Sequence, residues 1–312
     1  MDIKRRKKIS KGDDTPSILT KRTKSEKVVY AIAFIIMFIY AISLLYPLFY
    51  LTINSFQDAL VYTDNLIKGE NPFAFPSTWH PENYITAIQG MYMTDSWGEK
   101  VYLPEMFFNI LWYCGMALVA GVFSCSCTAY ILSKYRFKGR NFIYGLFIVV
   151  MTLPITGTGG ADFKLFSDLG LYNNPLYVLI TNLGGYGFNF LVMYGVFTNV
   201  SWSYSEAVFI DGGGHFTAFF KVMLPQVISP IIMLGVLGFI GQWNNYTTPL
   251  LYLPDFPTVS SGLYRIQKSF LRDGDKPAYY AGLMLATIPL IVLYMCFSDK
   301  ITKNMAIGGL KG

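Results

Sequence analysis

Two carboxylates in a short polar stretch are the most evident side chains that could do chemistry. Glu206 and Asp211 lie in EAVFIDGGGHFTAFFKVMLP, which separates two of the most apolar parts of the chain. Carboxylates placed this way could accept hydrogen bonds from basic side chains or backbone N–H groups of a partner. The sequence contains no Walker A pattern, HExxH, GxSxG or kinase signature. The stretch therefore predicts a contact surface, and we expect the chain to have no catalytic residues and not to be an enzyme.

Metal-ligating residue types are too scattered to form a site. His80 and His215 are far apart in the sequence, and the cysteines all fall in apolar runs without metal-site spacing. These cysteines are Cys114, Cys125, Cys127 and Cys296. We expect them to act as small packing residues, with no metal or cofactor bound by this chain.

The elements that hold the polar stretch are predicted to be transmembrane helices. Hydrophobic residues make up 53% of the chain and charged residues 14%, whereas soluble domains are roughly a quarter charged. Charge-free runs cover 28–57, 106–133, 141–161, 169–205, 222–254 and 277–298. Each supplies the ~20 apolar residues that cross a bilayer, where only helices satisfy the backbone within one segment. The sequence therefore predicts an all-α membrane protein with six transmembrane helices.

The first apolar run has the basic flank of a signal peptide. Its apolar part, Val28 to Leu51, exceeds the roughly 7–15 residues of a signal-peptide core, and no small-residue cleavage site follows. We expect it to be an uncleaved first helix.

Lysine and arginine set the predicted orientation. Residues 1–27 carry ten bases against four acids, and KYRFKGR (134–140) has four bases and no acid. The connection 58–105 holds seven acids and two bases. The positive-inside rule then places both termini, 134–140 and the glycine-rich turn in the cytoplasm. The connections 58–105, 157–174 and 255–278 would lie outside.

These assignments divide the chain into three parts. They are a basic cytoplasmic N-terminal segment (1–27), a transmembrane domain (28–304) and a cytoplasmic C-terminal tail (305–312). The protein would be a multi-pass protein of the cell (inner, cytoplasmic) membrane. We interpret the basic N-terminal segment as an orientation signal and an anionic-lipid contact, so no nucleic-acid partner is expected.

The polar stretch predicts two short helices joined by a glycine turn. Ser203 and Glu206 have the S-x-x-E spacing of a capping box, so a helix should start near Ser203. It should stop at 212–214, where three glycines permit unusual backbone conformations. In the second helix, four side chains at i, i+3, i+4 and i+7 predict one apolar face. They are Phe216, Phe219, Phe220 and Met223, and Pro225 follows them.

Two further groups of residues are candidates for packing and for a transport path. A stripe of small residues at four-residue spacing predicts close helix approach; it comprises Ala117, Gly121, Cys125 and Ala129. Polar side chains in or near the apolar runs could face a translocation path. They are Asn109, Asn182, Asn189, Gln242, Asn244 and Asn245.

The polar stretch also resembles a known family signature. Its pattern E-A-x-x-x-D-G, an aromatic-rich spacer and a terminal Leu-Pro look like the EAA signature of ABC importer membrane subunits. The matching positions are Glu206, Ala207, Asp211, Gly212, Leu224 and Pro225, with mild departures at Val208, Gly213 and Val222. AYILSKYRFKGRN (129–141), LPI (153–155), LGLYNNPLYVLI (169–180), GQWNNYTTPLLYL (241–253) and GGLKG resemble the carbohydrate-uptake, maltose-type branch. The resemblance covers roughly residues 28–312.

This resemblance implies a fold, a function and a set of partners. The fold would be the type I ABC importer permease fold, with 201–225 as a cytoplasmic coupling segment. The chain would pair with a homologous second permease, two ATPase subunits that hold ATP and Mg²⁺, and an extracytoplasmic solute-binding protein. The expected solute is an oligosaccharide or a polysaccharide-derived sugar. A secondary carrier and an ABC importer permease for a non-sugar solute are the alternatives.

The resemblance also assigns two contact regions. The ATPase would be contacted by Phe216 and Phe219 together with the matching signature residues. The external connection 255–278 mixes apolar and basic residues and can form an amphipathic segment. By its position it would dock the binding protein, through Tyr264, Arg265 and Lys268.

Overall fold

The computed structural model describes residues 24–69, 75–153, 157–273 and 275–309. The predicted N-terminal segment 1–27 therefore lies almost wholly outside the described residues. The side chains of the tail are outside them as well, although α15 continues to Gly309. The chain forms two compact units, Met1–Tyr50 and Leu51–Gly312, and each is described by itself.

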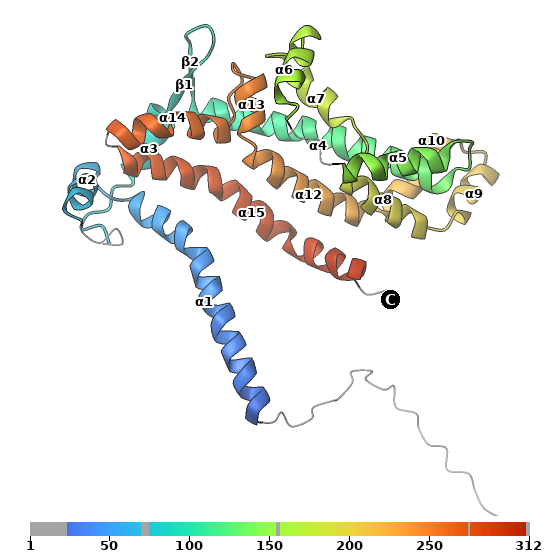
Figure 1. Cartoon of the computed structure of the whole chain (residues 1–312), viewed down its shortest axis with the longest axis horizontal. Helices are drawn as coiled ribbons and strands as arrows, with labels where there is room; N and C mark the ends of the chain where they lie inside the picture. Colours follow the sequence, from blue (N-terminus) through green and yellow to red (C-terminus); the bar gives the residue numbers. More distant parts are fainter. Residues whose placement is uncertain (1–23, 70–74, 154–156, 274, 310–312) are drawn as a thin grey trace, which may run out of the picture. The chain divides into compact units, whose positions relative to one another are not determined.

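The first unit contains most of helix α1 (Lys24–Asn54) (Figure 1). Its large apolar side chains are exposed from Val28 to Tyr46. A helix that is apolar all round and exposed is typical of a membrane span. α1 is one of three helices in the described chain that are long and apolar enough to cross a bilayer.

The second unit is built around α4 (Leu103–Lys134). Helices α7 (Leu176–Asn182), α8 (Phe188–Asn199) and α12 (Ile228–Asn244) pack against it, and α15 (Lys276–Gly309) packs on α12 (Figure 1). Two buried clusters form, one around the first half of α4 and one around its second half. α4 therefore connects the two ends of the bundle.

The small-residue stripe on α4 does allow close packing. Ala117, Cys125 and Ala129 are buried, and a Cβ at Gly121 would lie 3.7 Å from the Asn182 carbonyl oxygen. Small side chains permit the backbones of α4 and α7 to approach in this way. The prediction of close helix approach is confirmed.

The described residues do not contain six helices that are each long enough to cross a bilayer. Besides α1, the helices Leu103–Lys134 and Lys276–Ser298 are long enough to cross. A fourth crossing arises if His215–Gln226 and Ile228–Asn244, bent by 75°, form one broken span. α5 (Arg140–Thr152) has only 13 residues, and the run 169–205 is divided into α7 and α8. The number six therefore stays a prediction.

Glycine explains the division of the run 169–205. α7 ends at Asn182 and α8 begins at Phe188, and Gly185 and Gly187 between them have φ of 64° and 96°. Left-handed backbone of this kind does not continue a right-handed helix. Hydropathy alone could not place this break.

The region 58–105 contains the one departure from all-helical structure among the described residues. α2 (Ala59–Lys68) and α3 (Glu82–Gly90) precede a hairpin of β1 (Tyr92–Thr94) and β2 (Lys100–Tyr102). The strands are antiparallel, with Tyr92 opposite Tyr102. The Asp95 carboxylate accepts the N–H groups of Trp97 and Glu99 at the turn. The all-α expectation is corrected here, because the turn chemistry of Asp95 and Gly98 (φ 87°) favours a hairpin.

The predicted amphipathic segment in 255–278 is a helix. α13 (Thr247–Tyr252) precedes α14 (Val259–Asp273), and α14 buries Val259, Leu263 and Ile266. α6 (Gly159–Asp168) is the helix of the connection 157–174.

Candidate functional site

The polar stretch folds as two short helical segments around a glycine turn. α9 (Ser203–Ile210) is followed by α10 (His215–Thr217), the π-helical turn η1 (Ala218–Met223) and α11 (Leu224–Gln226). Gly212 has φ of 79°, a conformation that favours glycine. The predicted helix start at Ser203 and the predicted turn are confirmed.

The predicted capping box does not form. The residue before α9 is Trp202, which has helical φ and ψ and makes no side-chain capping bond. Ser203 is therefore the first residue of the helix, and its hydroxyl lies 2.8 Å from that of Ser201. An extended N-cap residue is needed for Ser-to-N3 capping, and Ser203 is already helical.

The aromatic face also differs from the prediction. Phe219 and Met223 are buried, whereas Phe216 is 81% exposed and Phe220 45% exposed. The backbone of η1 closes i→i+5 bonds, so its side chains do not follow the α-helical period of 3.6 residues. The four side chains therefore form two lines: Phe219 and Met223 are buried in the bundle, whereas Phe216 and Phe220 are exposed and border an open groove beside α4.

The exposed part of the stretch carries most of the signature residues. Glu206, Ala207, Asp211 and Gly212 are all exposed. Of the last two matching positions, Leu224 is half-buried and Pro225 is exposed. The structure thus leaves the two carboxylates of the stretch open to a partner.

Sequence reasoning missed one apolar residue beside these carboxylates. Ile210, the last residue of α9, is 85% exposed. An isoleucine this open, next to Asp211 and the glycine turn, is an apolar contact that a partner could bury. Its position directly before Asp211 was the only signal in the sequence.

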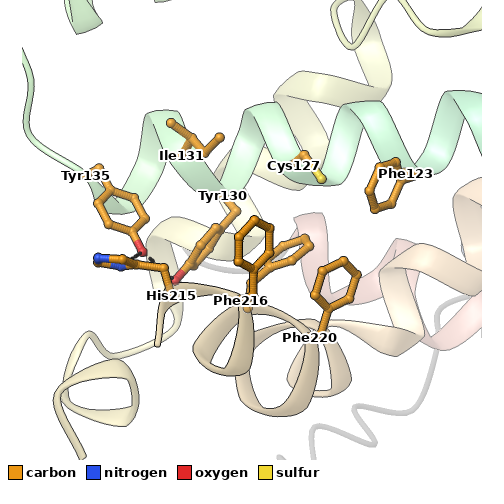
Figure 2. A pocket seen from close by; sticks show the side chains of 9 residues that line it. Phe123, Cys127, Tyr130, Ile131, Tyr135, His215, Phe216 and Phe220 are labelled. Carbon is orange, nitrogen blue, oxygen red and sulfur yellow. Dashed lines mark hydrogen bonds between the residues drawn. The ribbon is translucent and has the colours of Figure 1, made fainter. Parts of the chain in front are cut away.

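Aromatic contacts fix the inner side of the stretch to α4. The Tyr135 hydroxyl lies 2.9 Å from His215 Nδ1 (Figure 2). The rings of Tyr130 and Phe219 have centroids 4.9 Å apart. Burial raises the pKa of Tyr135, and its hydrogen bond to Tyr130 acts in the same direction. Tyr135 is therefore a neutral phenol at physiological pH.

An apolar groove runs between α4 and this segment. Its volume is about 360 Å³. Figure 2 shows Phe216 and Phe220 on one side and Phe123 and Cys127 on the other. The stretch is thus joined to α4 by ring contacts and one hydrogen bond, with open apolar space beside them.

The predicted polar path residues do not gather into one site. Asn182 and Gln242 meet, with Gln242 Nε2 3.4 Å from Asn182 Oδ1, and the buried Gln242 Oε1 has no hydrogen-bond partner in the part of the chain that the structure describes. Asn245 Nδ2 lies 3.4 Å from the Tyr113 hydroxyl. The pair Asn182–Gln242 lies at the break between α7 and α8.

The other three path candidates are placed apart from this pair. Asn109 Nδ2 donates to the Pro257 carbonyl at 3.1 Å, and its Oδ1 accepts from Trp112 Nε1. Asn244 donates to the Ile240 carbonyl of its own helix, and Asn189 is exposed at the start of α8. Asn109 therefore ties the connection 255–278 to α4.

The predicted docking residues lie on α14. Tyr264 is 49% exposed and stacks on Tyr246 with centroids 4.3 Å apart, and Arg265 is exposed. The side chain of Lys268 lies outside the described part of the structure. A Cβ at Gly262 would lie 2.3 Å from Met106 Sδ, so glycine lets α14 sit close to α4.

A carboxylate that sequence reasoning did not single out joins three connecting segments. Asp255 Oδ1 accepts the Ser96 N–H at 2.7 Å, and its Oδ2 accepts from Asn173 Nδ2. Burial opposes ionisation of Asp255, but these hydrogen bonds outweigh it and hold its pKa below the ordinary value. The hairpin, the 170–174 turn and the start of 255–278 are thereby linked.

No metal site is present among the described residues. No three His, Cys, Asp or Glu side chains gather there, and the four cysteines are free.

Comparison with known families decides the identity of the chain. Residues 117–307 match the family described as "Binding-protein-dependent transport system inner membrane component". The match includes the whole polar stretch and most of α4, α12 and α15. The chain belongs to this family. It is therefore a membrane-spanning permease subunit of a binding-protein-dependent ABC importer, as the signature predicts.

Curated relatives of this permease align over most of both chains. The probable ABC transporter permease protein YurM of Bacillus subtilis is 26% identical over 282 residues, covering 89% of this chain and 87% of the relative. The diacetylchitobiose uptake system permease protein NgcG of Streptomyces coelicolor is 24% identical, covering 91% and 90%. The arabinooligosaccharides transport system permease protein AraQ of Halalkalibacterium halodurans is 26% identical, covering 86% and 91%.

A solved structure shares the fold of this permease. It belongs to a bacterial ABC transporter involved in the import of the acidic polysaccharide alginate. The TM-score is 0.72 at 21% sequence identity, over 89% of this chain and 98% of that chain. The predicted ABC importer permease fold is confirmed.

Proposed function

We propose that this permease imports an oligosaccharide or a polysaccharide-derived sugar. The observation that carries the proposal is the end-to-end similarity to permeases named for diacetylchitobiose and arabinooligosaccharide transport. The complex would contain a homologous second permease, two ATPase subunits and an extracytoplasmic solute-binding protein. ATP and Mg²⁺ would be held by the ATPase subunits.

Six crossings with both termini in the cytoplasm complete the proposed arrangement. The crossings would be α1, α4, α5, the α7–α8 pair, α12 and α15. Support comes from the basic turn 134–140 and the acidic connection 58–105. This orientation puts α9 and the glycine turn on the same side as the ATPase.

The exposed residues of the polar stretch are the proposed contact with the ATPase. A short helix with an apolar anchor and flanking charges fits a groove on a partner. Ile210 would supply the anchor, and Glu206 and Asp211 would accept hydrogen bonds at its edges. Phe216, which is exposed and borders the groove beside α4, would extend this surface beyond the turn.

The buried side chains of the polar stretch would transmit the motion of the ATPase to the transmembrane helices. Phe219 and Met223 belong to the same buried cluster as Ala129 and Tyr130 of α4. Closely packed protein interiors move as near-rigid bodies and switch between discrete arrangements. A displacement of the stretch by the ATPase would therefore displace α4 and α12 with it.

The polar pair Asn182–Gln242 is our candidate for a sugar contact in this chain. It lies at a helix break, where membrane transporters place binding groups, and Gln242 Oε1 is free to accept a hydroxyl. The external face is proposed to dock the binding protein through Tyr264 and Arg265 of α14, with Lys268 beside them in sequence.

Transport by the assembled complex tests the proposed function. The complex would be purified through this chain, reconstituted in proteoliposomes and supplied with its binding protein and a panel of labelled neutral and acidic oligosaccharides. We expect uptake of one sugar class that requires ATP. Uptake driven by an ion gradient without ATP, or of non-sugar solutes only, would overturn the proposal.

Co-purification tests the ATPase contact. Glu206→Ala and Ile210→Ser should leave the permease inserted and paired but should weaken recovery of the ATPase. Glu99→Ala, which removes an exposed acid from the external hairpin, is the matched control. Normal ATPase recovery and uptake in both variants would remove this contact from the proposal.

A further inference from the structure

The turn between α4 and α5 forms a cavity that the transport cycle described above does not use. Its volume is about 410 Å³. The lining residues are Arg136, Phe137, Gly139, Arg140, Asn141 and Phe142. Two guanidinium groups and two phenyl rings thus border one open space.

The charge around this cavity is entirely positive in the sequence. No Asp or Glu occurs between Glu105 and Asp162, whereas Arg136, Lys138 and Arg140 fall within five positions. Arg136 and Lys138 are exposed and have no carboxylate within ion-pair distance among the described residues. Such a site favours a ligand that brings its own negative charge.

One arginine is held in place for this ligand. An Arg140 terminal nitrogen, NH2, donates to the Tyr194 hydroxyl at 3.1 Å and lies 3.5 Å from the Ser133 carbonyl oxygen. A guanidinium has five N–H donors, so this anchoring leaves donors for an anion. The Tyr194 contact fixes the direction of the group without neutralising it.

The backbone at the start of α5 adds to the positive electrostatic potential around the cavity. Gly139, with φ of 91°, turns the chain into α5, and no side chain caps the first turn of that helix. The N–H groups of Asn141 and Phe142 belong to this turn and both residues border the cavity. The free N–H groups at a helix start attract anions and reinforce the arginines.

An apolar stripe continues from the cavity along α5. Phe142, Leu146 and Val149, spaced i, i+4 and i+7, are 74%, 47% and 50% exposed. α5 has no fully buried residue, and Phe137 beside the cavity is 42% exposed. A basic cavity that opens onto an exposed apolar stripe matches a molecule with an anionic head and a hydrocarbon tail.

We propose that this cavity binds the phosphate head group of an anionic phospholipid of the cytoplasmic leaflet. Arg136 and Arg140 hold the phosphate, Lys138 of the same turn adds a further positive charge, and an acyl chain lies along Phe142, Leu146 and Val149. The inference rests on the orientation in the proposed function, which places 134–140 in the cytoplasm. A soluble anion would satisfy the bases but not the stripe, and an acidic protein surface would not enter hydrocarbon.

Lipid retention by the purified complex tests the site. Nanodiscs of phosphatidylcholine alone, or with phosphatidylglycerol, would carry the complex with wild-type chain or with Arg136→Gln/Lys138→Gln. The matched control is Lys100→Gln/Lys164→Gln, which removes two charges elsewhere. We expect phosphatidylglycerol to bind wild type and control alike, and the double variant about thirty-fold more weakly, from about 1 kcal/mol per charge. Equal retention by the double variant would overturn the proposal.

A second measurement keeps the native bases and so does not depend on folding of the double variant. A photocrosslinker in place of Phe142 should label phosphatidylglycerol in the wild-type background. Crosslinks to the ATPase or second permease alone would show a protein contact instead and would overturn the lipid site. Displacement of the lipid by inorganic phosphate would show a soluble-anion site and would also overturn it. Uptake and ATPase recovery, measured in parallel, report separately on the proposed function.

Discussion

The Tyr135 hydroxyl lies 2.9 Å from His215 Nδ1, although the two residues are 80 positions apart. Tyr135 follows the last residue of α4, and His215 is the first residue of α10. Their rings also meet edge to face, with centroids 5.5 Å apart. This contact joins the central helix of the bundle to the segment proposed to meet the ATPase.

Removing that hydrogen bond should loosen the link between the two helices. Tyr135→Phe keeps the ring and deletes the hydroxyl, so we expect a loss of about 1 kcal/mol of stability. ATP hydrolysis should persist, while sugar uptake per ATP hydrolysed should fall. Tyr172→Phe, at an exposed external tyrosine, is the control. An unchanged ratio of uptake to hydrolysis in Tyr135→Phe would show that the bond does not transmit motion.

The glycine turn should tolerate substitution at one position and not at another. Gly212 has φ of 79°, so Gly212→Val forces a β-branched residue into left-handed backbone at a cost of about 1–2 kcal/mol. Gly214 has φ of −91° and no atom within 4 Å of an added Cβ. We expect Gly212→Val to weaken ATPase recovery and Gly214→Ala to leave it near wild type. Equal recovery in the two variants would contradict the structural role of the turn.

Phe219 should contribute to the stability of the chain, and Phe216 to binding of the ATPase. Phe219 is buried, and its truncation in Phe219→Ala should destabilise the chain by about 3–5 kcal/mol. Phe216 is 81% exposed, so Phe216→Ala should leave thermal stability in detergent unchanged and affect only ATPase binding. Comparable losses of melting temperature in both variants would favour one continuous apolar face instead.

The Asp255 carboxylate predicts a pH dependence of the contact between the β1–β2 hairpin and the connection 255–278. Its folded-state pKa lies below the ordinary value of 3.8, so the folded state favours the ionised form. The stabilisation is therefore present above pH 3.8 and is lost as the pH falls through the lowered pKa. The protection of the Ser96 amide, measured as its exchange rate relative to that of an unstructured peptide at the same pH, should be high at neutral pH and should be lost below pH 3.8 in the wild type.

Asp255→Asn should remove most of that protection already at neutral pH. Asp168→Asn, which changes an exposed external acid, should preserve it. If Ser96 exchanges at the same rate in the wild type and in Asp255→Asn, the carboxylate does not hold the hairpin.

Local sequence patterns were sufficient to predict several features of this permease. Charge-free runs predicted the long apolar helices α1, α4 and α15, since hydropathy and length together specify such segments. The start of α9 at Ser203 and the left-handed Gly212 also followed from residue type and order. The signature around Glu206 identified the family that residues 117–307 match.

Contacts between distant segments were decided only by tertiary packing. The π-helical turn places Phe219 in the core and Phe216 outside, which a fixed helical period does not predict. Asp255 finds Ser96 and Asn173 only because three connecting segments that are far apart in the sequence converge. Tyr135 reaches His215 for the same reason: side-chain pairing across 80 positions depends on how helices pack, and local sequence carries no record of that geometry.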